Sequence, residues 1–313
     1  MPIPFSLDHI NLWVLRDHDG WTIIDTGFYS LESVSLWEAV LSGHCKGEKI
    51  NKIIVTHFHP DHVGMAGWLV NKTAAPLHMS QGEFDMLHIA CQAFTNEQNV
   101  TRRQFYQCFG LPENTISKLL DRKGSYIDGV PNAPLLFQRM NDSESIEING
   151  ESWQFHNFSG HSPEHVCLFN AQRNILISGD QVLPSISPNI SVSYNQQHAD
   201  PLANYLSSLS ALSTLPADVL VLPSHGRVFK GLHNRTKDLM AGHQKDLDKL
   251  QLFCQQPRTG HEVMEKLFGD HLNLFNIFLA VGEALAHLNC LVEQNKLTRI
   301  AGPTIRYQTE VKV

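Results

Sequence analysis

The feature that most constrains this sequence is a dense cluster of metal-binding residue types directly after a short apolar run. The run, Ile-Ile-Val, is typical of a buried strand, and Pro60 cannot continue the strand's ladder, so the cluster is predicted to lie where the strand passes into a loop. Side chains two positions apart share one side of an extended segment, so the first two histidines could bind one ion while the aspartate and third histidine turn towards another. This density favours a metal site over a loop that is merely rich in histidine. The cluster consists of His57, His59, Asp61 and His62.

Three later segments complete a resemblance to a known family. The cluster resembles the His-x-His-x-Asp-His signature of the metallo-β-lactamase superfamily, which also needs a histidine in a Gly-His turn, an aspartate in a Gly-Asp turn and a late histidine beside a glycine. His161, Asp180 and His225 meet these requirements in order, each after an apolar, strand-like run. The resemblance covers about residues 5–230 and implies the family's α/β fold, a four-layer αββα sandwich.

The resemblance also implies how these ligands share two metal ions. In the family, two groups of three ligands each hold one ion, and one carboxylate bridges both. The corresponding residues are His57, His59 and His161 for one ion, Asp61, His62 and His225 for the other, and Asp180 as the bridge. Nitrogen and carboxylate ligands without a thiolate favour zinc, with manganese, iron or cobalt as alternatives.

The same resemblance implies hydrolysis by a hydroxide that bridges the two ions. Asp61 is then the candidate catalytic residue, transferring a proton to the leaving group. We expect a metal-dependent hydrolase acting on a (thio)ester or lactone carbonyl of a small molecule, because a net charge of −7 disfavours nucleic acid. The alternatives are a phosphodiesterase or ribonuclease of the superfamily, a mononuclear iron enzyme resembling persulfide dioxygenases, and a metal-binding protein without enzymatic activity.

Cysteine usage and the amino terminus indicate the cellular setting. Six cysteines are scattered without a Cys-x-x-Cys pair, which disfavours a disulfide framework or thiolate zinc site and fits a reducing compartment. The first residues lack the basic region and apolar core of a signal peptide, and no uninterrupted apolar run of about 18 residues occurs. We therefore expect a cytoplasmic, soluble protein that binds a small-molecule substrate, has no membrane partner and could form a homodimer.

The chain is predicted to divide into a catalytic domain over residues 1–230 and a helical, winged-helix-like module over residues 231–313. A helical insertion over about residues 80–140, starting with a capping-box spacing from Ser80 to Glu83, is predicted to select the substrate or form a dimer surface. From residue 256 onward, six Lys or Arg balance six Asp or Glu. The tail is therefore expected to pack on its own core or a second subunit, through Leu285, Leu288, Leu291 and Val292, rather than on a phosphate backbone. A hairpin is expected from Leu297 to Tyr307, with its turn at Gly302-Pro303.

Two further residues near the signature have open roles. Asp25 belongs to an Asp-Thr-Gly turn that lies beneath the metal site in the family, so it either orients a metal ligand or is an ordinary loop aspartate. His165 is expected to support the site or the fold rather than to bind metal, because seven ligands already fill two sites.

Overall fold

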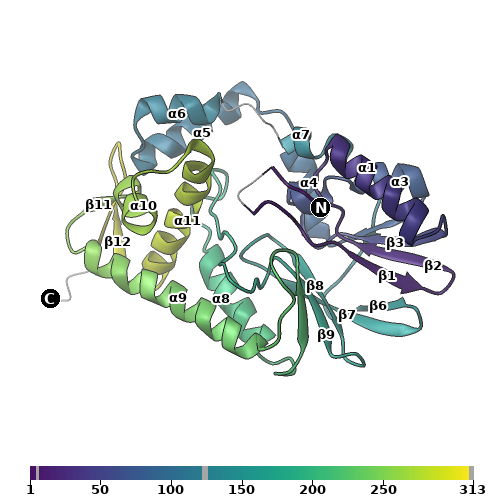
Figure 1. Cartoon of the computed structure of the whole chain (residues 1–313). Coiled ribbons are helices and arrows are strands. Elements are labelled where there is room, and N and C mark those ends of the chain that lie inside the picture. Colours follow the sequence, from purple (N-terminus) through teal and green to yellow (C-terminus); the bar gives the residue numbers. More distant parts are fainter. Residues whose placement is uncertain (5–6, 122–125, 310–313) are drawn as a thin grey trace. The chain divides into compact units, whose positions relative to one another are not determined.

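The structure, a computed structural model, describes residues 1–4, 7–121 and 126–309 and divides into two compact units (Figure 1). Unit 1 comprises Met1–Gln92, Gly124–Pro188 and Leu212–Arg235. Unit 2 comprises Ala93–Lys123, Asn189–Ala211 and Thr236–Val313. Each unit is thus assembled from three separate stretches of the chain.

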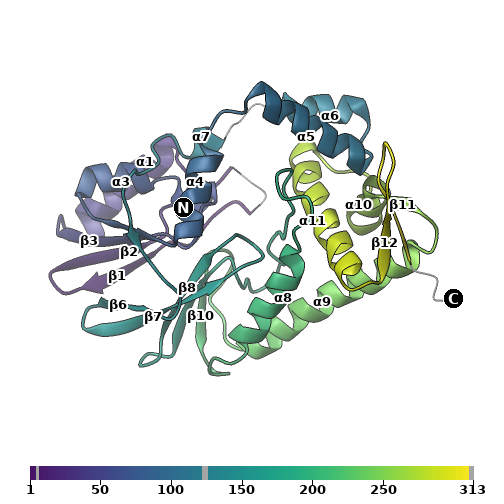
Figure 2. The same ribbon diagram turned by 180° about the vertical axis from the view of Figure 1, so that it is seen from behind.

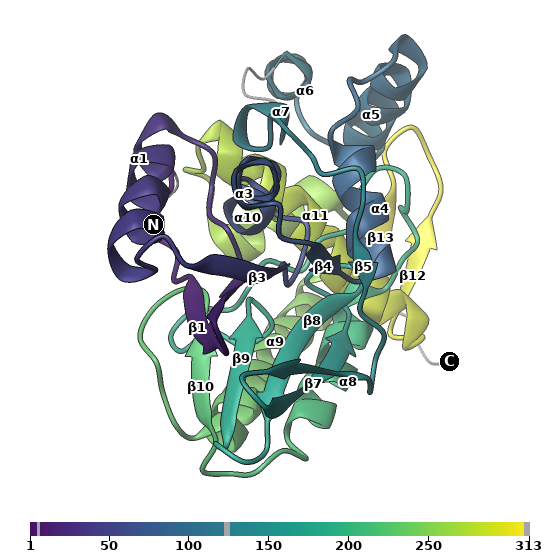
Figure 3. The same ribbon diagram turned by 90° about the vertical axis from the view of Figure 1, so that its right-hand side faces the viewer.

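Unit 1 contains two five-stranded sheets, which Figure 3 shows as two layers. The first sheet, in the order β1-β2-β3-β4-β5, consists of β1 (Trp13–Asp17), β2 (Gly20–Ile24), β3 (Lys49–Ile54), β4 (Leu77–Met79) and β5 (Gln138–Arg139). The second, in the order β10-β9-β8-β7-β6, consists of β6 (Ser145–Ile148), β7 (Glu151–Phe158), β8 (His165–Asn170), β9 (Ile175–Gly179) and β10 (Leu220–Pro223). Within the second sheet β7, β9 and β10 run in the same direction, so their carboxyl ends meet at one edge.

Alternation along β2 and β3 places the first sheet between two apolar layers. Ile23 and Ile53 pack in the cluster that includes the side chains of the helices, whereas their neighbours Ile24 and Ile54 pack against Trp153 and other residues of the second sheet. The helices of unit 1 are α1 (Leu31–Ala39), η1 (Val40–His44), α2 (Pro60–Val63), α3 (Ala66–Thr73), α4 (Gln81–Ala90) and α7 (Tyr126–Gly129). Two facing sheets, the first of them covered by helices on its other face, confirm the α/β sandwich predicted from the sequence.

Unit 2 is mainly helical and carries a small sheet of order β11-β13-β12 (Figure 2). Its strands are β11 (Arg258–Thr259), β12 (Leu297–Ile300) and β13 (Arg306–Thr309). Its helices are α5 (Asn96–Phe109), α6 (Glu113–Leu120), α8 (Pro201–Leu212), α9 (Leu232–Phe253), α10 (Gly260–Phe268) and α11 (Leu274–Glu293), of which α8 ends and α9 begins in unit 1. Strands β12 and β13 pair antiparallel, as the carboxyl-terminal hairpin predicted from the sequence requires.

Helix α11 is the apolar centre of unit 2. Leu285, Leu288 and Leu291, which the sequence predicts to pack the tail, are buried, and Val292 is half-buried. By length and composition alone α11 could cross a membrane, but 61% of its most apolar window is buried inside the structure. Its apolarity is therefore that of a core helix.

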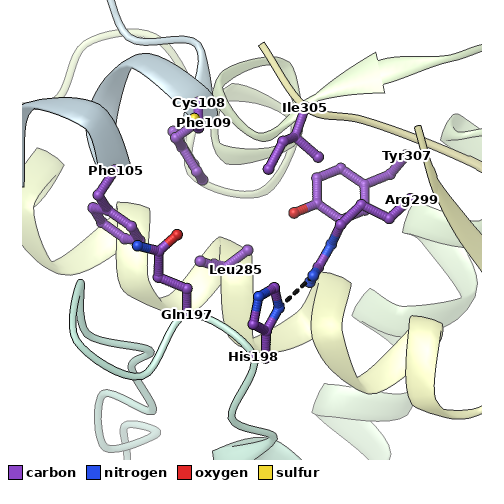
Figure 4. Close-up of a pocket in the computed structure, with 9 residues that line it drawn as sticks. All are labelled: Phe105, Cys108, Phe109, Gln197, His198, Leu285, Arg299, Ile305 and Tyr307. Atoms are coloured by element: carbon purple, nitrogen blue, oxygen red, sulfur yellow. Dashed lines mark hydrogen bonds between the residues drawn. The ribbon is translucent and has the colours of Figure 1, made fainter. Parts of the chain in front are cut away.

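Polar contacts connect α11 to the segment before α8 within unit 2. Arg299 donates hydrogen bonds to His198 and to Asn289 Oδ1 (2.8 Å), while the Asn289 amide donates to the Gln197 and Ala199 carbonyls. Figure 4 shows Arg299 and His198 meeting at a cavity of about 20 Å³, which is room for little more than a water molecule. The Arg299 charge is thus engaged in holding the fold of unit 2.

The segment predicted as an insertion, about residues 80–140, contributes to both units. Helices α4 and α7 belong to unit 1, where Leu87 of α4 is buried in the core beside the first sheet. Helices α5 and α6 belong to unit 2.

Candidate metal centre

The seven predicted ligands all lie just beyond the carboxyl ends of strands in unit 1. The His-x-His-x-Asp-His cluster follows β3 and runs into α2, with Pro60 as the first residue of that helix. His161 follows β7, Asp180 follows β9 directly, and His225 follows β10. Because β7, β9 and β10 run in the same direction, three turns that are distant in the sequence bring their ligands to one place.

Three imidazoles form the first group of ligand atoms. The distance from His57 Nε2 to His59 Nδ1 is 3.0 Å, and that from His57 Nε2 to His161 Nε2 is 3.3 Å. Ligand atoms about 2.0–2.1 Å from a tetrahedral ion lie roughly 3.3–3.4 Å from one another. The spacing in this group therefore suits one small divalent ion.

The second group combines two imidazoles with a carboxylate. His225 Nε2 lies 3.3 Å from Asp61 Oδ2, and His62 Nε2 lies 3.8 Å from the same oxygen. Asp180 lies between the two groups, with Oδ2 3.6 Å from His161 Nε2, and Oδ1 3.5 Å from His62 Nε2 and 3.6 Å from His225 Nε2. Each carboxylate oxygen of Asp180 thus faces a different group, as a bridging ligand requires.

Buried atoms without hydrogen bonds show that this cluster fits metal ions. His62 Nε2, His225 Nε2 and Asp180 Oδ1 are inaccessible to solvent and have no hydrogen-bond partner in the part of the chain that the structure describes. Leaving such groups unsatisfied costs about 1–3 kcal/mol each. Both Nε2 atoms lie within 3.6 Å of Asp180 Oδ1, so a divalent ion bound by the second group would satisfy all three.

The charges of the site also suit metal ions. Burial and neighbouring imidazoles lower the pKa of His57 well below its ordinary value and that of His59 to about 3, so both rings are neutral at pH 7. Burial also lowers the pKa of His62, but Asp180, Asp25 and Asp61 outweigh it and raise this pKa well above its ordinary value. A cation would satisfy the same carboxylates in place of that proton, which is why metal binding to such sites releases protons.

Asp25 orients residues of the cluster through hydrogen bonds, which is one of the two roles considered for it from the sequence. Its carboxylate accepts hydrogen bonds from His62 Nδ1 (2.8 Å), from the Thr56 N–H (2.8 Å) and from the Thr56 hydroxyl. The Thr56 oxygen in turn lies 3.0 Å from His57 Nδ1. A carboxylate only accepts hydrogen bonds, so His62 Nδ1 carries a hydrogen and the Thr56 hydroxyl gives its own hydrogen to Asp25. The Thr56 oxygen then accepts from His57 Nδ1, which also carries a hydrogen. Both Nε2 atoms therefore keep a lone pair for a metal.

Two other candidate ligands are oriented by hydrogen bonds, His225 to a backbone carbonyl and Asp180 to a histidine side chain. His225 Nδ1 donates to the His9 carbonyl (2.9 Å), which leaves its Nε2 facing the cluster. His165 Nε2 accepts from the Asp180 N–H (3.1 Å), and a Cβ on Gly179 would lie 2.5 Å from the His165 ring. The structure thus places His165 behind the Gly-Asp turn, where it supports Asp180.

Glu83 contacts two of the loops that carry candidate metal ligands, although the sequence did not identify it as a site residue. The capping box predicted from Ser80 to Glu83 is wrong: Ser80 makes no side-chain cap and instead donates to the Glu164 carbonyl (2.7 Å). Glu83 accepts hydrogen bonds from the loops of the first metal motif and of His161. Burial raises its pKa to about 7 although these hydrogen bonds oppose the shift.

Comparison with known proteins finds similarity along nearly the whole chain. The model of the metallo-beta-lactamase superfamily matches residues 6–225, and a model described as the metallo-beta-lactamase-like C-terminal domain matches residues 247–310. The chain is 25% identical to the probable metallo-hydrolase YqjP of Bacillus subtilis, over 99% of this chain and 96% of that protein.

Two solved structures resemble the whole chain. A beta-lactamase domain protein from Burkholderia ambifaria has a TM-score of 0.91 and 36% identity, covering 99% of this chain and 91% of that one. The metallo-beta-lactamase family protein TTHA1429 from Thermus thermophilus has a TM-score of 0.82 and 27% identity, covering 99% and 97%. The similarity therefore extends over both units.

Proposed function

Because this chain belongs to the metallo-β-lactamase superfamily and is a metal-dependent hydrolase, we propose that its seven-residue cluster binds two divalent ions and hydrolyses a (thio)ester or lactone of a small organic molecule. One observation carries the two-ion proposal: Asp180 directs one oxygen to each ligand group, while the Nε2 atoms of His62 and His225 are buried without hydrogen bonds to any residue that the structure describes.

The ligands divide by their distances. His57, His59 and His161 would hold one ion, Asp61, His62 and His225 the other, and Asp180 both. The ligand atoms of this set are nitrogen and oxygen, which suits zinc best. The nearby Cys167 thiol does not belong to the set, because it donates to the Ser178 carbonyl. When bound, two such ions lower the pKa of a shared water to about 7 and polarise the oxygen of the scissile group.

Among the chain's own residues, we assign proton transfer to Asp61. Its side chain is 13% exposed, whereas that of its neighbour His62 is fully buried, so Asp61 lies nearer the open side of the cluster. Its carboxylate can hold the proton released by the attacking water and pass it to the oxygen or sulfur of the leaving group. No serine or cysteine nucleophile is required.

The choice of substrate rests on charge. With a net charge of −7 the chain repels polyanions at long range, which supports a compact organic substrate over RNA. In unit 2, Arg299 is engaged with His198 and Asn289, which removes one cation from those available to a phosphate backbone.

The test combines metal analysis with a substrate panel. We expect two metal equivalents per chain, and turnover of thioesters, carboxylic esters or lactones but not of phosphodiesters. Asp180→Ala should lower metal content and turnover together, whereas Asp218→Ala, at an exposed aspartate of the same unit, should change neither. A single equivalent of iron with oxygen consumption would instead support the dioxygenase alternative, and phosphodiester turnover the nuclease.

A further inference from the structure

Glu83 joins the two loops that carry the three-histidine group. Its Oε2 accepts from the Phe58 N–H (2.9 Å), the peptide between the two histidines of the His-x-His pair. Its Oε1 accepts from the Ser162 hydroxyl (2.6 Å), directly after His161, and from the Glu164 N–H (2.7 Å). One fully buried carboxylate thus contacts a loop from each of the two sheets.

A second set of contacts fixes Glu83 itself. The Glu164 carboxylate accepts from the Gly82 N–H (2.6 Å), and Ser80 donates to the Glu164 carbonyl (2.7 Å). A Cβ on Gly82 would lie only 3.0 Å from the Glu164 Cβ, so the helix and loop are in close contact. The first turn of α4 is therefore held rigidly against the loop that follows His161.

We propose that Glu83 is a positioning residue that fixes the His57 and His59 pair against His161. These imidazoles lie on loops of different sheets, yet their ligand atoms must be placed to within about 0.5 Å for a metal to bind well. A second connection, the Val166 N–H to the Thr56 carbonyl (2.9 Å), also joins the two loop regions, so the loss of Glu83 should loosen the group without abolishing it.

A carboxylate is required because three donors converge on it. A glutamine at position 83 offers one acceptor oxygen, and its amide N–H would face either the Phe58 N–H or the Glu164 N–H. The site is closed to solvent, so water cannot relieve this conflict. The peptide that meets the amide must move, and with it one side of the three-histidine group.

The inference rests on the proposed metal site but not on the substrate, and metal affinity tests it directly. To measure the metal affinity of each ion site by itself, one ligand of the other site is removed. The His225→Ala protein retains the three-histidine group, and the His161→Ala protein retains the group of Asp61, His62 and His225. We expect Glu83→Gln to weaken Co²⁺ binding about 10–100-fold in the His225→Ala background and less than about 2-fold in the His161→Ala background. Asp85→Asn, at an exposed carboxylate of the same helix, should change neither affinity.

The possible outcomes separate this inference from the proposed function. Equal affinities with and without Glu83→Gln, or equal weakening in both backgrounds, would overturn the positioning role. If Glu83→Gln fails to fold, Ser162→Ala provides the test, because it removes one of the three donors to Glu83. It should weaken Co²⁺ binding a few-fold at the three-histidine group only, and any other result would overturn the inference. Failure of the otherwise unchanged chain to bind metal would refute the proposed function instead.

Discussion

Substituting Asp25 tests the assigned roles of the cluster most directly. Its carboxylate determines which ring nitrogen carries the hydrogen in two candidate ligands, His62 and His57. It accepts from His62 Nδ1 directly and reaches His57 through the Thr56 hydroxyl. In Asp25→Asn the backbone N–H of Thr56 still needs an acceptor, so the amide oxygen should turn to it (2.8 Å in the parent). The new amide N–H then faces His62 Nδ1, which must give up its hydrogen to Nε2.

The magnitude follows from the number of ligands affected. A hydrogen on His62 Nε2 blocks the lone pair that the metal needs, and loss of such a supporting partner typically costs 10–100-fold in metal affinity, or about 1.4–2.7 kcal/mol. Because Asp25 is buried and 1% exposed, water cannot replace it. We therefore expect Asp25→Asn to weaken the group of Asp61, His62 and His225 by that factor, and the three-histidine group by less.

Chelator competition with Co²⁺ in the same single-site backgrounds measures both affinities. Thr56→Val, which keeps the branched shape but loses the hydroxyl, should weaken the three-histidine group and spare the other, and Thr56→Ser should restore it. Circular dichroism of the metal-free proteins controls for misfolding. A folded Asp25→Asn protein that binds both ions with parental affinity would refute the assigned hydrogen positions.

Two further predictions concern stability and the tail. Burial raises the pKa of Asp17, but Lys52 (2.6 Å), the Asn149 N–H and Thr22 outweigh it and lower this pKa from 3.8 to about 2. The ionised form of Asp17 therefore stabilises the fold above pH 4, and this stabilisation is lost as the pH falls towards 2. Asp17→Asn should therefore lower the free energy of urea unfolding by about 2 kcal/mol at pH 7, with a difference that shrinks at pH 3, and a pH-independent difference would contradict this. In the tail, the cation Arg299 is engaged within unit 2 and the carboxylate of Glu283 accepts a hydrogen bond from the Asn189 amide (2.8 Å). Because both side chains are engaged inside the protein, we expect no binding of duplex DNA or RNA at physiological salt. Salt-dependent RNA binding that weakens on Arg306→Ala would favour the nuclease alternative.

Much of the fold was predictable because its signals are local. A short run of β-branched residues predicts a buried strand, and the strand that precedes the His-x-His pair is present as β3. The carboxyl-terminal hairpin is present as β12 and β13. The resemblance to the metallo-β-lactamase signature also predicted His161, Asp180 and His225, which the structure brings together with the first cluster.

The supporting residues were decided by tertiary structure. From Ser80 to Glu83 the sequence has the spacing of a capping box, worth about 1 kcal/mol, yet Glu83 bonds to residues 25, 79 and 81 positions away. Asp25, at a φ of 58°, likewise contacts residues 31 and 37 positions away. The sequence by itself determined the candidate ligands, through the resemblance of their motifs to a family, and the strands that carry them, because both signals lie in short stretches of neighbouring residues. Only the fold could determine which carboxylate holds which loop, because those hydrogen bonds form between segments that meet only when the sheets pack.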